Sequence, residues 1–193
     1  HLDGGLRAKT IIDIAKTKNL TVPSSDEQEL ENWFFENIST DKKQVFKKFE
    51  MTISVMQDAD SIRRVAYEAV EDLVEDGVVY GELRYAPLQH LQGKLSSQEV
   101  VDAVSAGIKD GQKDFGGEFY TILCAMRQHK NSTEVAELAI KNFNNKVIGF
   151  DLAGPEYNFP PSLHKEACNL ISESEVGLTI HAVSYTHLTL PTR

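Results

Sequence analysis

Polar residues, among them histidine and aspartate, occur in this sequence at places where an apolar run ends. The clearest segments are "HLDG" at 1–4, "DLAG" at 151–154 and "HA" at 181–182, and "RYAP" at 84–87 and "MRQH" at 126–129 follow the same pattern. A neutral imidazole is a good ligand for zinc, and an ionised carboxylate accepts hydrogen bonds from polar ligands. His1, Asp3 and His181 therefore have side chains of the kind that could hold a metal ion or a polar substrate.

The segments around these residues predict the elements that must position them. Four apolar or β-branched runs read as buried strands, at 77–87, 118–129, 146–156 and 176–182. Between them lie amphipathic stretches of helical period, at 60–76, 97–115 and 132–145, each with Ser or Asp near its start as a helix cap. Strands that alternate with helices predict an α/β fold with a parallel sheet, either doubly wound or closed as a barrel.

The position of the polar residues favours the barrel. In a (β/α)8 barrel the active site is built at the carboxyl ends of the strands, which is where these polar segments fall. A dinucleotide-binding fold would instead show a GxGxxG turn after its first strand, and this sequence contains none.

Composition excludes several classes of partner. The 193 residues carry 29 acidic against 20 basic side chains, for a net charge of -9, and no Lys/Arg run could follow a phosphate backbone. The longest apolar runs fall far short of the roughly 20 residues that cross a bilayer, and the first residues do not form a signal peptide. We expect a soluble protein with no nucleic-acid or membrane partner. Cys124 and Cys168 lie in apolar segments, which favours buried free thiols in a reducing compartment over a disulfide.

Four segments together carry a family resemblance. They are "HLDGGLRAKTI", "RRVAYEAVEDLVEDGVVYGELRYAP", "GFDLAGPE" and "GLTIHA", in this order and at these intervals. They resemble the adenosine deaminase family of metal-dependent barrel amidohydrolases, over residues 1–182, and "DLAG" favours the adenosine branch over relatives acting on adenine or AMP. The resemblance implies a partial (β/α)8 TIM barrel that covers the rim of strand 1 through strand 5.

The same resemblance implies a zinc site. His1 matches the second histidine of the family's HxHLDG motif, and His181 matches the third zinc-binding histidine. Two alternatives from the residues themselves stay open. His1 could be a solvated terminal residue, and His181 could be a hydrogen-bonded core histidine. His90 and His129 match no metal position, and His164 is expected at the surface.

His1, Asp3 and Gly154 are implied to bind the substrate. Asp3 would hydrogen-bond the ribose hydroxyl, although it could instead cap the helix that begins near Leu6. The backbone N–H of Gly154 would meet a purine ring nitrogen, although glycine there could simply serve a turn. Asp151 and Glu156 are possible supporting carboxylates, with neither preferred.

A helical segment at 45–56 resembles the cover of the family's purine pocket. Val45, Phe46 and Phe49 are its candidate apolar residues. Residues at this helical spacing could equally be ordinary core.

The resemblance fails after Ala182. The family continues with Gly-Glu, whose glutamate protonates the purine, whereas this chain continues with Val183 and Ser184. No catalytic residue is therefore assigned, and residues 183–193 are expected to be a non-native tail. The implied reaction is hydrolysis of adenosine or 2′-deoxyadenosine to inosine and ammonia by a zinc-activated water, in cytoplasmic purine salvage, with this chain inactive alone. A barrel deaminase of adenine or another purine, or a non-catalytic short form, stays open, as does the oligomeric state.

Overall fold

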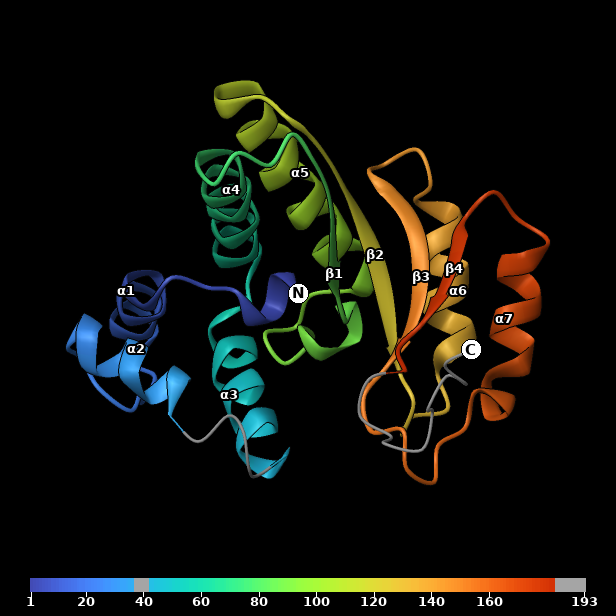
Figure 1. The fold of residues 1–193 in the computed structure, drawn as a ribbon, viewed down its shortest axis with the longest axis horizontal. Coiled ribbons are helices and arrows are strands. Elements are labelled where there is room, and N and C mark those ends of the chain that lie inside the picture. The colour runs from blue at the N-terminus through green and yellow to red at the C-terminus, as the bar shows by residue number, and fades with distance from the viewer. Residues whose placement is uncertain (37–41, 183–193) are drawn as a thin grey trace, which may run out of the picture. The chain divides into compact units, whose positions relative to one another are not determined.

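The computed structural model describes residues 1–36 and 42–182, and for residues 42–46 only the main chain is described. The chain divides into two compact units. Unit 1 contains His1–Gly81 and Gln89–Phe119, and unit 2 contains Glu82–Leu88 and the residues from Tyr120 onward. Figure 1 shows the elements along the chain.

Unit 1 is mainly helical. After a short 3-10 helix at Leu2–Gly4, its helices are α1 (Ala8–Lys18), α2 (Glu27–Phe35), α3 (Lys42–Val55), α4 (Ala59–Glu75) and α5 (Ser97–Phe115). Helix α5 begins with a capping box, in which the Ser96 side chain accepts from the Glu99 N–H and the Glu99 side chain accepts from the Ser96 N–H.

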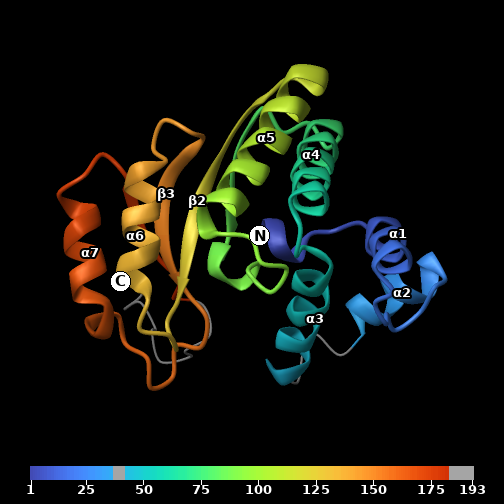
Figure 2. The same cartoon turned by 180° about the vertical axis from the view of Figure 1, so that it is seen from behind.

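Glycine lets α4 and α5 pack closely side by side, as Figures 1 and 2 both show. A Cβ atom added at Gly107 of α5 would lie 2.3 Å from the main-chain oxygen of Arg63 on α4, so no larger residue fits there.

The sheet contains four strands in the described residues. They are β1 (Tyr80–Tyr85), β2 (Glu118–Met126), β3 (Val147–Ala153) and β4 (Gly177–Ile180), hydrogen-bonded in the order β1-β2-β3-β4. Strand β3 pairs in parallel with both β2 and β4. Strands β1 and β2 begin in unit 1 and continue into unit 2.

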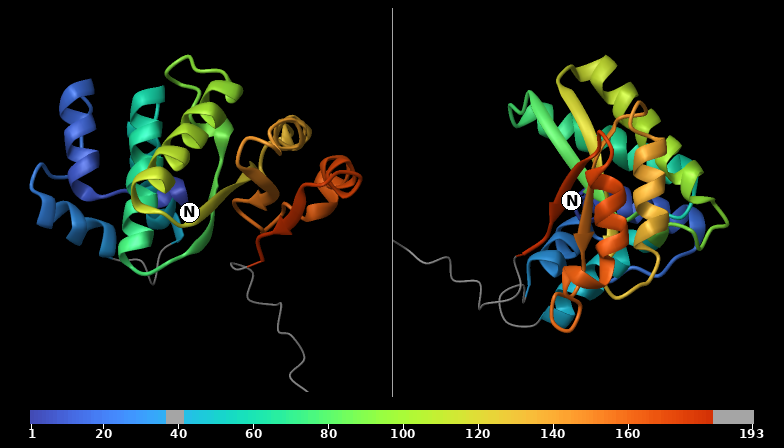
Figure 3. Two further views of the ribbon diagram at one scale, coloured as in Figure 1. Left: turned by 90° about the horizontal axis from the view of Figure 1, so that it is seen from above. Right: turned by 90° about the vertical axis from the view of Figure 1, so that its right-hand side faces the viewer.

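The connections in unit 2 identify the fold class. Helix α6 (Ser132–Lys141) links β2 to β3, and α7 (Lys165–Ser172), preceded by a 3-10 turn at Pro161–His164, links β3 to β4. Both helices cover the same face of β3 and β4 (Figures 1, 2 and 3). Sequential parallel strands with crossovers on one face form a singly wound sheet, whereas a doubly wound sheet reverses its strand order. The fold is therefore α/β, as part of a (β/α)8 barrel.

The predicted elements are confirmed with small changes at their ends. Each of the four expected strands is present and is shorter than the apolar run that predicted it. Helix α6 ends at Lys141, four residues before the predicted end, because residues 142–146 form turns instead.

The interior of the sheet explains why its strands read as continuous apolar runs. Leu123, Phe150 and Leu152 on one face of the sheet have no exposed surface, and Ile122 and Cys124 on the other face are 2% and 3% exposed. A parallel strand covered on both faces needs apolar side chains on both.

Both cysteines are free thiols, as predicted. Cys124 is buried, whereas Cys168 on α7 is only partly buried, so the expectation that both thiols are buried is wrong for Cys168. No helix in the described part of the chain combines the length and the apolar character needed to cross a bilayer.

Candidate metal and substrate site

His1 and Asp3 lie together at the start of unit 1. His1 Nδ1 is 3.9 Å from Asp3 Oδ1, and the His1 ring meets the Phe49 ring edge-on with centroids 5.7 Å apart. Asp3 is buried, and its main-chain oxygen accepts a 2.5 Å hydrogen bond from the Thr52 hydroxyl on α3. Helix α3 therefore holds the "HLDG" segment in place.

One of the two roles considered for Asp3 is wrong. Helix α1 begins at Ala8, its capping residue is Arg7, and no side chain caps it. Asp3 belongs to the separate 3-10 helix at Leu2–Gly4, because "LDG" makes a tight turn before the chain enters α1. Binding of a ribose hydroxyl by Asp3 stays a prediction.

The buried histidine His90 interacts electrostatically with Asp3. His90 has no exposed surface, and its Nδ1 lies 3.0 Å from the main-chain oxygen of Met56. A carbonyl only accepts, so Nδ1 carries a hydrogen. Burial lowers the pKa of His90 below its ordinary value, and the negative charge of Asp3 raises it in part.

The predicted cover of the site is described only at Phe49. A Cβ atom at Gly4 would lie 2.6 Å from Phe49 Cε1, so this ring packs directly against the "HLDG" turn. The side chains of Val45 and Phe46 lie outside the described residues.

His181 follows β4 in unit 2 and is bound by a buried carboxylate. Its Nδ1 lies 2.5 Å from Asp151 Oδ2, and its main-chain N–H donates to Asp151 Oδ1 at 3.1 Å. The guanidinium of Arg127 donates to the main-chain oxygen of His181. Both the ring and the main chain of His181 are therefore fixed by neighbouring side chains.

Asp151 has more contacts with the candidate site than we expected from the sequence. It has no exposed surface, and its Oδ2 also receives Arg84 Nη1 at 3.0 Å and lies 3.7 Å from the Cys124 sulfur. The signal was a carboxylate inside the apolar run "GFDLA", since a buried charge needs a partner of opposite charge or several hydrogen bonds. Arg84 in "ELRYA" supplies that partner.

Gly154 follows the last residue of β3 and has a conformation that favours glycine. Its φ is +91°, and an added Cβ atom would lie 2.7 Å from Gln128 Oε1 and 3.1 Å from Met126 Cε. The turn therefore explains the residue type by itself. Contact of the Gly154 N–H with a purine stays a prediction.

The expectation that His164 lies at the surface is wrong. It is 4% exposed, its Nε2 donates to the main-chain oxygen of Arg127 at 3.1 Å, and its Nδ1 accepts from the Ser132 hydroxyl at 2.9 Å. The short 3-10 turn before α7 directs this ring inward, which the helix-like sequence did not indicate.

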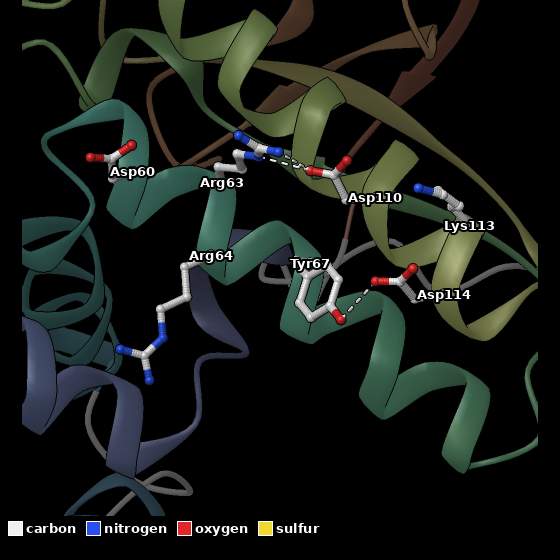
Figure 4. Close-up of a pocket in the computed structure, with 7 residues that line it drawn as sticks. All are labelled: Asp60, Arg63, Arg64, Tyr67, Asp110, Lys113 and Asp114. Atoms are coloured by element: carbon white, nitrogen blue, oxygen red, sulfur yellow. Dashed lines mark hydrogen bonds and ion pairs between the residues drawn. The ribbon is translucent and has the colours of Figure 1, made fainter.

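The structure also contains a groove that none of the four predicted site residues lines. It has a volume of about 400 Å³ and lies between α4 and α5 (Figure 4). Within the groove Arg63 pairs with Asp110 and the Tyr67 hydroxyl donates to Asp114, while Arg64 pairs with Glu68 on its own helix.

The candidate metal donors fall in different units, with His1 in unit 1 and His181 in unit 2. Within the described residues no group of three or more His, Cys, Asp or Glu side chains could hold a metal ion. His1 and His181 nevertheless have the right donor atoms for zinc, because imidazole nitrogen is a common zinc ligand. A metal-bound histidine commonly donates its other ring N–H to a carboxylate, which is the arrangement of His181 and Asp151.

These features define an α/β barrel protein with polar residues at the carboxyl ends of its strands. The chain belongs to the adenosine deaminase family, whose family model, "Adenosine deaminase", matches residues 1–189. An adenosine deaminase of Mycobacterium avium is 43% identical over 189 residues, which cover 94% of this chain and 52% of that protein. The chain therefore spans about half the length of the curated relatives it matches.

Solved structures share the fold at lower identity. The adenine deaminase of Arthrobacter aurescens matches with a TM-score of 0.81 and 20% identity, over 94% of this chain and 55% of that one. An amidohydrolase of Burkholderia ambifaria, solved with bound zinc, matches with a TM-score of 0.78 and 20% identity, over 94% of this chain and 50% of that one. Both likenesses confirm the partial barrel.

Proposed function

We propose that this chain is part of an enzyme that hydrolyses adenosine, and 2′-deoxyadenosine, to inosine and ammonia. The observation that carries the proposal is family membership over nearly the whole chain. The segments "HLDG", "DLAG" and "GLTIHA", which resemble motifs of the family, support it. In this reaction water adds to the purine carbon that bears the amine, and the C–N bond to ammonia then breaks.

Each proposed site residue has a separate task. His1 and His181 are zinc ligands, and zinc when bound supplies a nucleophile from water near neutral pH. Asp3 accepts a hydrogen bond from a ribose hydroxyl, and the N–H of Gly154 donates to a purine ring nitrogen. His1 also lines the substrate site. The burial of Asp3 and the rigid turn at Gly154 support these tasks, because fixed groups orient a substrate without further ordering.

The remaining groups of the reaction are not supplied by the described residues. Val183 and Ser184 stand where the family has Gly-Glu, so the acid that protonates the purine has no counterpart here. We propose that the domain comprises residues 1–182, that residues 183–193 are a non-native tail, and that the chain is inactive alone. The family resemblance implies a cytoplasmic enzyme of purine salvage, and the free thiols agree with a reducing compartment.

A substrate panel on the full-length protein tests the proposal. Adenosine, 2′-deoxyadenosine, adenine and AMP are each added with zinc present, and conversion is followed by ultraviolet absorbance. We expect turnover of the two nucleosides, and Asp3→Ala should reduce it. Turnover of adenine alone, unaffected by Asp3→Ala, would instead identify an adenine deaminase.

A further inference from the structure

We infer that Asp151 is a positioning residue for the metal site, which holds His181 in the tautomer that presents Nε2 to the metal, and that Arg84 keeps Asp151 able to do so. The inference deepens the proposed function and rests on it for the identity of the metal. The hydrogen bonding that carries it is independent of any metal.

Both carboxylate oxygens of Asp151 are used to hold His181. Oδ2 lies 2.5 Å from the ring Nδ1, and Oδ1 accepts from the main-chain N–H at 3.1 Å. A single carboxylate thus fixes the ring and the backbone of one residue. This arrangement sets both the position of the imidazole and its rotation.

The strand register explains how Asp151 reaches His181. Asp151 is paired with Thr179 of β4, and His181 follows two residues later, so all three side chains point to the same face of the sheet. Cys124 is the partner of Asp151 on β2, and its thiol lies 3.7 Å from Oδ2 on that face. The contact is therefore built into the parallel pairing.

Arg84 gives the buried carboxylate of Asp151 a cationic partner. The carboxylate has no exposed surface, so it needs such a partner. Arg84 Nη1 at 3.0 Å from Oδ2 places a positive charge against it. An ionised carboxylate can only accept, so the hydrogen of a neutral His181 ring resides on Nδ1.

This tautomer has a consequence for metal binding. A neutral imidazole binds a metal through the nitrogen that carries no hydrogen. With Nδ1 protonated, that nitrogen is Nε2. We therefore assign Asp151, which acts on the metal through His181, as a positioning residue and not as a metal ligand.

The first test is the tautomer of His181 in the unmodified, metal-free, full-length protein. Histidine is labelled with ¹⁵N, and the ring nitrogens are assigned by NMR at a pH above the ordinary imidazole pKa of about 6.5. We expect Nδ1 to be protonated and Nε2 to be unprotonated. The opposite tautomer, or a mixture of the two, would overturn the inference without the need for any variant.

The second test is Asp151→Asn, with Glu137→Gln as the matched control at an exposed site of α6. The amide can orient its NH₂ toward Nδ1, so we expect a shift toward the other tautomer and a 10- to 100-fold weaker zinc Kd, as is typical for loss of a partner of a ligating histidine (about 10–100-fold). The control should change neither value. Asp151→Asn with the tautomer and zinc Kd of the unmodified protein would contradict the inference.

Two further outcomes are distinguishable. Loss of one ligand from the metal's coordination sphere in Asp151→Asn, with the His181 tautomer unchanged, would make Asp151 a ligand and overturn the inference. An unmodified protein that binds no zinc and leaves adenosine unchanged would refute the proposed function, while the tautomer of the metal-free protein would still decide the role of Asp151.

Discussion

Arg84 Nη1 lies 3.0 Å from Oδ2 of Asp151, which joins a partly exposed cation on β1 to a fully buried carboxylate on β3. Both residues are in unit 2. The pair links the first and third strands of the sheet beside the candidate metal ligand His181.

Arg84→Met should destabilise the protein, because it leaves the carboxylate of Asp151 buried without its cation. Breaking a fully buried pair costs about 3–5 kcal/mol, and since the Arg84 side chain is 29% exposed we expect roughly 2–3 kcal/mol. Urea unfolding of the full-length protein measures the change. Arg63→Met is the control, because its pair with Asp110 is exposed and should cost less than about 1 kcal/mol. Equal losses in the two variants would contradict the special role of Arg84.

The buried ring of His90 should make the protein less stable in acid. Burial lowers its pKa in the folded protein below the ordinary value of 6.5. Above pH 6.5 the ring is neutral in both folded and unfolded protein and the pKa shift contributes nothing. As the pH falls below 6.5, the unfolded chain binds a proton that the folded chain resists, so the free energy of unfolding decreases.

His90→Gln should flatten this part of the pH dependence. The measurement is the urea midpoint at a series of pH values from 8 to 5, for the unmodified protein and for each variant. His129→Gln, at an exposed position, should leave the slope unchanged. An identical slope in the unmodified protein and His90→Gln would show that other groups cause the acid sensitivity.

Gly154→Ala should cost more stability than Gly116→Ala. The two glycines have nearly the same φ, +91° and +90°, so alanine is strained at each by about 1–3 kcal/mol. A Cβ atom at Gly116 meets nothing within 4 Å, whereas at Gly154 it meets Gln128 Oε1 at 2.7 Å. Thermal unfolding of both variants measures the difference. A smaller loss for Gly154→Ala than for Gly116→Ala would show that Gln128 moves aside freely.

Residues 1–193 expressed alone should associate and should not deaminate adenosine. Strand β4 is last in the described sheet order, and Leu178 and Ile180 on it are 41% and 40% exposed. An uncovered strand edge with apolar side chains promotes association between chains. Size-exclusion chromatography with an adenosine assay provides the measurement. A monomer with a sharp thermal transition and measurable turnover would contradict this expectation.

The sequence predicted the strands well because their apolar runs are long and end in polar residues. The choice of a barrel over a doubly wound sheet followed from the position of those polar residues at the carboxyl ends of the strands. The burial of His164 and the element that contains Asp3 could not be predicted from the sequence. The inward direction of His164 depends on a four-residue turn, and the start of α1 at Ala8 excluded Asp3 as its cap.

The Asp151–His181 contact could be derived from the sequence only in part. The run "GFDLA" shows that a carboxylate is buried, but its partners depend on the register between β3 and β4. The alternation of residues along one strand shows which of its side chains share a face, but not which residues of the neighbouring strand lie beside them. Pairing with neighbouring strands adds the register, and a single sequence does not contain it.

The zinc content and adenosine turnover of the full-length protein, compared with those of His181→Ala, test the proposed metal site most directly. We expect the unmodified protein to bind zinc and to convert adenosine to inosine. His181→Ala should lose zinc and slow turnover by at least about 100-fold, because the metal contributes several kcal/mol to the rate. Unchanged zinc content and unchanged turnover in His181→Ala would show that His181 is a structural residue and not a zinc ligand.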